Sequence, residues 1–232
     1  MPTHDDATLE IAVIDDDLSA LSSLARLLKS AGIEVKTFAS ARDFLADPND
    51  ALVDCVVSDL RMPEIDGLTL LEQMAELAPE LSMVFITGRA DVPSAVRAMK
   101  EGAVDFLEKP IRGERLIDAI DRAAQSTRRR RASRAHLETL RLRYQRLTGR
   151  ERQVFALVTQ GLLNKQIAYE LGTTDKTVKV HRARVMDKME AESLADLVRM
   201  ASALQIHVEA PPRAPGPAVA PPASRRTVTT PY

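Results

Sequence analysis

Three short polar phrases in this chain, each closing an apolar run, could together form one chemical site. The first is Asp15-Asp16-Asp17, the second ends at Asp59, and the third is centred on Lys109. Carboxylates, a metal ion and a lysine are the groups that an acyl phosphate needs. Parallel strands of an open α/β sheet present their carboxyl ends at one edge, so residues far apart in the chain converge there. We expect a single acidic crevice, lined by Asp15, Asp16, Asp59, Thr87 and Lys109.

The aspartate triplet also has a simpler interpretation. It directly precedes a helix expected at residues 18–31, so it could be a cluster that caps this helix. Asp59 and Lys109, at the ends of other predicted strands, favour the chemical interpretation. We expect Asp17, which lies past the strand end, to point away from the crevice.

The segments that would position these residues alternate between two patterns. Short apolar or β-branched runs predict strands at residues 9–14, 33–38, 51–57, 82–87 and 104–107. Helices are expected at residues 18–31, 41–46, 67–77, 91–99 and 112–124. This alternation predicts an α/β fold with a doubly wound, five-stranded parallel sheet. On the first and third helices the expected inward residues are Leu21, Leu24, Leu27, Leu28, Leu68, Leu71, Met74 and Leu77.

Length and composition indicate a two-domain protein. The chain has 232 residues, enough for more than one core. Its one cysteine, Cys55, excludes a disulfide within the chain and is expected to be a small buried side chain. No apolar run approaches the ~20 residues of a membrane span, and residues 1–10 lack an apolar signal core. We therefore expect a cytoplasmic protein without a membrane partner.

The net charge of −1 conceals a division between the two halves of the chain. Residues 1–125 carry 12 Lys and Arg against 24 Asp and Glu, a formal charge of −12. Residues 126–232 carry 20 against 9, a formal charge of +11. This asymmetry predicts an acidic module joined to a module whose partner is polyanionic.

A basic segment separates the two halves. It contains Arg128-Arg129-Arg130-Arg131 and continues into a stretch with Leu137, Leu140 and Tyr144 at helical spacing. The arginine run could be a solvated face or a supplementary arm that contacts nucleic-acid phosphates. We expect domains at residues 9–125 and 147–207, a basic helical linker at 126–146, and a disordered Pro/Ala-rich tail at 208–232.

The basic half contains a compact all-α unit with the layout of a helix-turn-helix. Helices are predicted at residues 150–160, 164–171, 175–189 and 193–204, and Gly172-Thr173-Thr174 forms the turn. In the third helix Val178, Val185 and Met189 face inward, which leaves a polar face suited to the major groove. The residues expected to contact DNA are Thr177, Lys179, Val180, Arg182 and Arg184. In the fourth helix the inward residues would be Leu194, Leu197, Val198 and Ala201.

Three longer phrases make a family resemblance plain. Residues 56–63 (VVSDLRMP) and 102–110 (GAVDFLEKP), with the aspartate triplet and Thr87, resemble the flavodoxin-like receiver domain of two-component response regulators. Residues 177–183 (TVKVHRA) resemble the LuxR-type helix-turn-helix. The pairing of the two domains resembles the FixJ/NarL family.

The resemblance implies a role for each residue of the crevice. Asp59 would accept the phosphoryl group from a phosphohistidine on a sensor histidine kinase. Mg²⁺ would be bound by Asp16, Asp59 and the backbone carbonyl of Arg61, with Asp15 acting through water. Lys109 would pair with one phosphoryl oxygen, and the Thr87 hydroxyl would donate to another.

The resemblance also implies a switch. Thr87 would move toward the phosphoryl group, Phe106 would turn inward, and the Lys109–Pro110 bond would be cis. Phosphorylation would then favour a homodimer built on the face near Phe106, with two helix-turn-helix units on a DNA site of approximate two-fold symmetry. RNA polymerase is a further expected partner.

Two alternative functions also fit parts of the sequence. The order Asp15, Thr87, Lys109 also fits a haloacid dehalogenase-like, Mg²⁺-dependent phosphatase with Asp15 as its nucleophile. Such a site needs a further acidic pair at a strand end after the lysine, whereas Asp118 and Asp121 fall on a predicted helix. The other alternative is a constitutive DNA binder whose receiver is not phosphorylated and serves for dimerisation.

Overall fold

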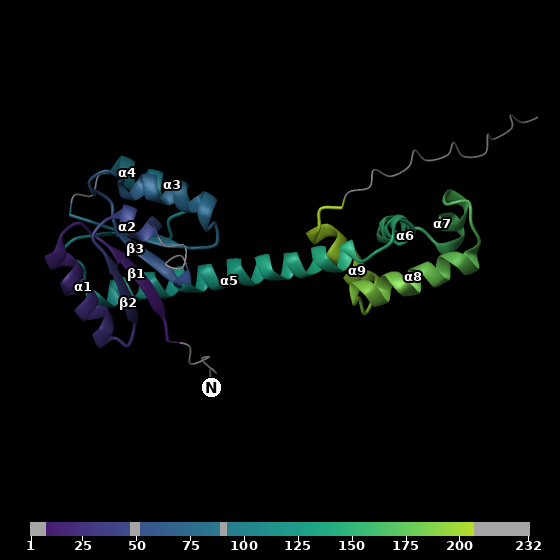
Figure 1. Ribbon diagram of the computed structural model, residues 1–232, viewed down its shortest axis with the longest axis horizontal. Coiled ribbons are helices and arrows are strands. Elements are labelled where there is room, and N and C mark those ends of the chain that lie inside the picture. Colours follow the sequence, from purple (N-terminus) through teal and green to yellow (C-terminus); the bar gives the residue numbers. More distant parts are fainter. Residues whose placement is uncertain (1–7, 47–51, 89–91, 207–232) are drawn as a thin grey trace, which may run out of the picture. The chain divides into compact units, whose positions relative to one another are not determined.

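The computed structural model of the protein describes residues 8–46, 52–88 and 92–206. The chain forms two compact units that divide between His136 and Leu137. The first unit is built on five parallel strands in the order β2-β1-β3-β4-β5 (Figure 1). These strands are β1 (Glu10–Ile14), β2 (Glu34–Phe38), β3 (Cys55–Asp59), β4 (Met83–Thr87) and β5 (Asp105–Glu108). The doubly wound parallel sheet expected from the sequence is therefore confirmed.

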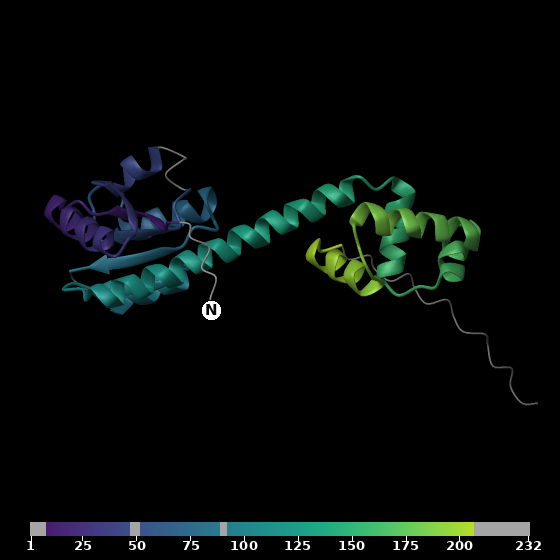
Figure 2. The ribbon, with the colours of Figure 1, turned by 90° about the horizontal axis from the view of Figure 1, so that it is seen from below.

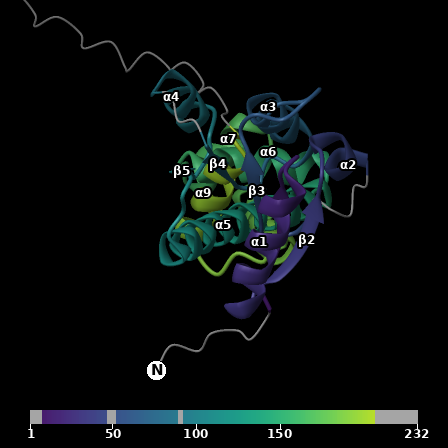
Figure 3. The ribbon, with the colours of Figure 1, turned by 90° about the vertical axis from the view of Figure 1, so that its left-hand side faces the viewer.

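Helices cover both faces of the sheet (Figure 3). They are α1 (Leu18–Ser30), α2 (Ala41–Ala46), α3 (Gly67–Leu77), α4 (Val92–Lys100) and α5 (Gly113–Gln145). Side chains of α2, α3 and α4 form one core with alternate residues of β1, β3 and β4, and side chains of α1 and α5 form a second core with the others. Burial on both faces explains why the three central strands, β1, β3 and β4, are almost continuously apolar.

Two helix positions expected to face the core are exposed. Leu77 is 69% exposed because it is the last residue of α3, and Leu70 is fully buried on that helix. Leu27 is 37% exposed at the flank of the buried face of α1, where its methyl groups lie over Gly113. Strand β3 also begins later than the predicted residue 51: it starts at Cys55, and the preceding Asp54 bonds to Glu10 through both its backbone N–H and its carboxylate.

Helix α5 is a single helix of 33 residues, where the sequence suggested a receiver helix and a separate helical linker (Figures 1 and 2). The arginine run lies on it and bonds back to the first unit. Arg128 pairs with the Asp54 carboxylate, Arg131 donates to the carbonyls of Leu52 and Val53, and Arg134 pairs with Glu80. Arg128, Arg131 and Arg134 are therefore tied to the first unit, whereas the Arg128 and Arg134 side chains stay 48% and 58% exposed, and a contact of this segment with nucleic-acid phosphates remains a prediction.

The second unit contains α6 (Gly149–Thr159), α7 (Asn164–Glu170), α8 (Asp175–Met189) and α9 (Leu194–Ala203). Its core includes Leu140 and Tyr144 from the end of α5 as well as the predicted Val178, Val185 and Met189. In α9, Leu197 and Ala201 are buried as predicted. Leu194 and Val198 are 39% and 41% exposed, because the buried face of α9 is centred on Leu197, Met200 and Ala201.

The sequence also predicts that the chain has no membrane span and that it ends in a disordered tail. Within the residues that the structure describes, no helix combines the length and apolarity needed to cross a membrane. The predicted disordered tail, residues 208–232, lies outside the described residues.

Candidate functional site

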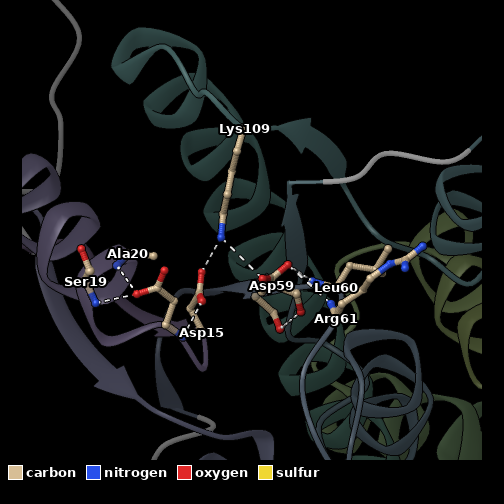
Figure 4. Close-up of polar contacts among 9 residues, drawn as sticks. Asp15, Ser19, Ala20, Asp59, Leu60, Arg61 and Lys109 are labelled. Atoms are coloured by element: carbon tan, nitrogen blue, oxygen red, sulfur yellow. Dashed lines mark hydrogen bonds and ion pairs between the residues drawn. The ribbon is translucent and has the colours of Figure 1, made fainter.

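The predicted acidic crevice lies at the carboxyl edge of the sheet (Figure 4). Asp15 directly follows β1, Asp59 ends β3, and Lys109 directly follows β5. Since β1 and β3 are neighbours in the sheet, the two carboxylates face each other, and Lys109 reaches in from above them in Figure 4. The Lys109 Nζ lies 2.7 Å from Asp15 Oδ2 and 3.5 Å from Asp59 Oδ2.

Each carboxylate is also held by the backbone. Asp15, with 1% of its surface exposed, accepts the N–H of Asp17 on Oδ1 at 3.0 Å. Asp59 Oδ1 accepts the N–H of Leu60 at 2.6 Å and that of Arg61 at 3.4 Å. In each residue the second oxygen faces Lys109, so the lysine is the cation that balances the pair.

The local backbone around Asp59 depends on a glycine. A Cβ atom on Gly67, the first residue of α3, would lie 2.7 Å from the Asp59 carbonyl oxygen and 2.7 Å from the Phe85 ring. The Gly67 N–H donates to the Leu60 carbonyl. A side chain at this position would push α3 away from the strand that carries Asp59.

Burial, neighbouring charges and hydrogen bonds shift the pKa values of Asp59 and Lys109. It raises the pKa of Asp59 above its usual value, and the neighbouring Asp15 adds to the rise, while Lys109 and the two backbone N–H groups reduce it. Burial alone would lower the pKa of Lys109, but its hydrogen bond to Asp15 and the charge of Asp59 reverse this, so the pKa is raised. Lys109 is therefore a cation throughout the neutral range.

The three carboxylates of Asp15, Asp16 and Asp59 form a candidate metal site. Each offers an oxygen, and these oxygens lie within 4.8 Å of one another. A set of carboxylate oxygens at an exposed edge suits Mg²⁺, which keeps several waters. Asp17 is not part of this cluster, because its Oδ1 caps α1 by accepting the N–H groups of Ser19 and Ala20. That the Arg61 carbonyl is a further ligand remains a prediction.

The residues of the expected switch lie beside the crevice. Thr87 ends β4 and is buried, and its carbonyl accepts the N–H of Lys109 at 2.8 Å. Phe106, on β5, is half-buried and packs against the core beneath α2, α3 and α4. The Lys109–Pro110 bond is cis, as the resemblance implied. Asp118 and Asp121 lie on helix α5, as predicted, and so do not follow the carboxyl end of a strand as the second acidic pair of such a phosphatase would.

The predicted DNA-contacting residues of α8 differ in their surroundings. Lys179, Val180 and Arg184 are exposed, although Lys179 pairs with Asp175 at 2.9 Å. Thr177 bonds to the side chain of Thr174, which caps α8. Arg182 is half-buried and donates to Asn164 Oδ1 at 3.2 Å, so it joins α8 to the first turn of α7.

Two structural contacts in this unit were not predicted. The sequence predicts a helix start at Asn164, but its bond to Arg182 has no signal in the sequence. The Thr148-x-x-Glu151 spacing, by contrast, is typical of a capping box, which the structure contains. Glu151 is 2% exposed and also accepts Lys188 Nζ at 2.6 Å. This hydrogen bond, with those from Thr148, lowers the pKa of Glu151 although burial opposes the change.

Comparison with known proteins assigns both units. Residues 11–121 match the response regulator receiver domain, and residues 145–201 match the bacterial regulatory proteins of the luxR family. The chain is 44% identical to Nodulation protein W of Bradyrhizobium diazoefficiens over 84% of this chain and 86% of that protein. It is 45% identical to the transcriptional regulatory protein FixJ of Rhizobium meliloti over 83% of this chain and 95% of that protein.

Solved structures agree with this assignment. The response regulator StyR is 43% identical and superposes with a TM-score of 0.72, covering 84% of this chain and 99% of the StyR chain. Full-length FixJ from B. japonicum is 43% identical with a TM-score of 0.50, covering 86% of this chain and 98% of that one.

Proposed function

The chain belongs to the FixJ/NarL family of DNA-binding response regulators, and we propose that phosphorylation of Asp59 controls its binding to DNA. The observation that carries the proposal is the convergence of Asp15, Asp59 and Lys109 at one edge of the sheet, with the Lys109 Nζ shared between the two carboxylates. This arrangement provides a nucleophile, a metal-binding pair and a cation in one place.

The phosphoryl donor is a phosphohistidine on a sensor histidine kinase. A carboxylate oxygen of Asp59 forms a bond to phosphorus as the bond from phosphorus to the imidazole nitrogen breaks. Asp15, Asp16, Asp59 and the carbonyl of Arg61 would hold Mg²⁺, which when bound neutralises charge on the transferred group. Lys109 pairs with one phosphoryl oxygen, and the Thr87 hydroxyl donates to another.

The acyl phosphate then shifts an equilibrium between two forms of the receiver. Thr87 moves toward the phosphoryl group and Phe106 turns inward, which favours a homodimer built on the nearby face. The dimer presents two α8 helices to a DNA site of approximate two-fold symmetry. Lys179, Val180 and Arg184 of α8 contact DNA together with Thr177 and Arg182. The regulator acts in the cytoplasm, where RNA polymerase is a further partner.

A pair of matched substitutions tests the nucleophile. Asp59→Asn should abolish incorporation of label from acetyl phosphate, because the amide is a poor nucleophile. Asp17→Asn should leave incorporation intact, because asparagine caps a helix about as well as aspartate. Full labelling of the Asp59→Asn protein would contradict the assignment.

Two assays of the wild-type protein distinguish the proposed function from the phosphatase and from the constitutive DNA binder. A phosphatase would release phosphate from a generic phosphomonoester with sustained turnover, which a regulator of this family should not do. A constitutive DNA binder would bind its DNA with equal affinity in the presence and absence of acetyl phosphate, and so would its Asp59→Asn variant.

A further inference from the structure

The arginine run on α5 divides into two groups with different surroundings. The inner arginines, Arg128, Arg131 and Arg134, bond to two carboxylates and two backbone carbonyls of the receiver. The outer arginines, Arg129 and Arg130, are exposed. Arg130 donates to a backbone carbonyl at 3.5 Å, and within the described part of the chain no carboxylate pairs with either outer arginine. Their charge is therefore not balanced by the receiver.

The outer arginines form a concentration of positive charge on an acidic domain. Residues 122–137 of α5 contain six arginines and no aspartate or glutamate, although residues 1–125 carry a formal charge of −12. No acidic side chain is therefore placed three or four residues from an outer arginine, where it would form an ion pair along the helix. Arg130 instead has Arg134 four residues away, a like-charge pair that disfavours the helix. Charge that weakens its own helix indicates a partner outside the receiver.

The surface around the outer arginines lacks the anchor residues that protein interfaces use. On the same side of α5 as Arg129, three, four or seven residues away, are the exposed Gln125, Ala132, Ser133 and His136. Between Met99 and Leu142 the structure describes no exposed large apolar side chain. Protein interfaces depend on aromatic or aliphatic anchors, whereas guanidinium groups match the geometry of phosphates. Exposed arginines among small and polar side chains therefore favour a nucleic acid as the partner.

The chain keeps the outer arginines near any DNA that the second unit holds. Leu140 is buried in the core of the second unit, ten residues after Arg130. Ten residues span at most about 36 Å even when fully extended, which is about one turn of the double helix. For any arrangement of the two units, this tether gives the outer arginines a high effective concentration of phosphates on the bound DNA.

We propose that Arg129 and Arg130 bind backbone phosphates of the duplex on which α8 is docked. The inference rests on DNA binding by the proposed function, and it adds a contact from the receiver that is independent of base sequence. The guanidinium groups donate to phosphate oxygens, and condensed cations leave the DNA in exchange. The inner arginines hold this part of α5 against the receiver, so the outer pair faces solvent.

The salt dependence of DNA binding by the full-length, acetyl phosphate-treated protein tests the contact. Arg129→Ala should lower the slope of log affinity against log salt by about 0.9 for each protomer, or about 1.8 for a dimer. Its deficit in affinity should then shrink about twelvefold between 50 mM and 200 mM salt. The Arg129→Ala/Arg130→Ala double variant should lower the slope about twice as much. Both changes should be equal on fragments with different flanking sequences.

Two control variants separate a direct contact from a general effect of charge. Arg129→Lys keeps the positive charge and should keep the slope. Arg26→Ala removes an exposed arginine from α1, elsewhere on the same acidic domain, and should leave the slope unchanged. Thermal melting of each protein identifies any variant that has lost its fold.

A thiol at position 129 tests the proximity of the helix to DNA. The one cysteine of the chain, Cys55, is buried, so Arg129→Cys adds an accessible thiol that has no competitor. An iron–EDTA reagent attached to this thiol should cleave the DNA backbone in the bound complex. The same reagent on Arg26→Cys should leave the DNA uncut, and equal cleavage from both thiols would contradict a contact specific to α5.

Three further results would overturn the inference. Wild-type slopes for Arg129→Ala and for the double variant would do so and leave the proposed function standing. A loss of dimers of the phosphorylated double variant without DNA, measured by sedimentation equilibrium, would assign the outer arginines to an acidic surface of a second copy. Absence of DNA binding by the phosphorylated wild type would remove the proposed function and this inference together.

Discussion

The three consecutive aspartates have three different environments, and these decide their roles. Asp15 is buried and hydrogen-bonded to Lys109, Asp16 lies at the exposed side of the carboxylate cluster, and Asp17 caps α1. The capping interpretation of the triplet therefore holds for Asp17 alone. The strand ends after Ile14, so each following residue faces a different direction, and one run of identical side chains supplies a lysine partner, a candidate metal ligand and a helix cap.

Mg²⁺ should stabilise the receiver, and Asp16→Ala should remove most of that effect. Crowded carboxylates repel one another, so a bound cation favours the folded state. At a hundredfold excess over the dissociation constant the gain is ~2.7 kcal/mol. Thermal unfolding with and without MgCl₂ measures it. Asp17→Asn is the control, since it keeps the cap, and an equal Mg²⁺ response in the Asp16→Ala protein would place the ion elsewhere.

Glu151 should make the stability of the second unit fall in acid. Its pKa is lowered in the folded state, so its stabilising effect is complete above the ordinary pKa of glutamate and is lost as pH falls through the lower folded value. Glu151→Gln should cost about 1–3 kcal/mol at pH 7, because Lys188 loses a charged partner, and less at pH 3.

Tyrosine fluorescence can follow this unit within the full chain. The protein has no tryptophan, and all three tyrosines lie beyond residue 136, at positions 144, 169 and 232. Glu170→Gln, an exposed change on α7, is the control. A Glu151→Gln penalty of the same size at pH 3 and pH 7 would contradict the assigned role of the ion pair.

At the scale of elements, side chains of α5 bond to the segments that precede β3 and β4, at the end of the sheet opposite the crevice. Arg128 and Arg131 bond to residues that precede β3, and Thr127 accepts the N–H of Ser82, which precedes β4. Both strands end at the site, in Asp59 and Thr87. The first half of the basic segment therefore belongs to the receiver, and the strands of the site are fixed at their other end by α5.

Arg131→Ala should loosen the start of β3, and Arg129→Ala should not. Arg131 is half-buried and satisfies two carbonyl groups, so its loss leaves them without that donor at a cost of about 1–3 kcal/mol. Arg129 is exposed. Hydrogen exchange followed by mass spectrometry on peptides that span residues 52–59 should show faster exchange in the Arg131→Ala protein. Equal protection in both variants would mean that the arginine bonds do not hold this edge.

The elements were predictable from local pattern, whereas contacts across the sheet were not. Apolar runs and their polar ends located the five strands and brought Asp15, Asp59 and Lys109 to one edge. Helices α2, α3 and α8 have the predicted bounds. The arginine run gave no such signal, because its partners Asp54 and Glu80 lie more than fifty residues earlier in the chain. Periodicity predicts Leu77 as an inward residue, yet it is exposed, because the pattern continues to the end of the helix whereas the sheet beneath it does not.

At the scale of the whole molecule, the linker helix ends inside the core of the second unit. Leu140 is 1% exposed, and the Tyr144 ring packs edge-on against Phe155 at 5.4 Å between centroids. Arg143 donates to the Met189 carbonyl and to Glu190 at the end of α8. The compact second unit therefore begins before Leu147, the start that the sequence suggested for this domain.

A fragment of residues 137–207 should be more stable than one of residues 147–207. The shorter fragment exposes the core where Leu140 and Tyr144 packed, and burying each such side chain contributes about 1.5–3 kcal/mol. Urea unfolding monitored by circular dichroism measures the difference. A variant of the longer fragment with Leu142→Ala is the control, because Leu142 is 59% exposed. Equal midpoints for the two fragments would show that the end of α5 is dispensable.

Phosphorylation should change how strongly salt weakens DNA binding by the full-length protein. A dimer places two α8 helices on one DNA, and the second binds at the high effective concentration that the first provides. Each phosphate contact adds about 0.9 to the slope of log affinity against log salt, so the slope should roughly double from the 137–207 fragment to the phosphorylated full chain.

Lys179→Ala removes one such contact per helix, and it should lower the slope by about one in the fragment and by about two in the phosphorylated dimer. The Asp59→Asn protein treated with acetyl phosphate should keep the slope of the fragment. A phosphorylated wild-type protein whose slope equals that of the fragment would use a single reading helix, and the proposed two-fold complex would be wrong.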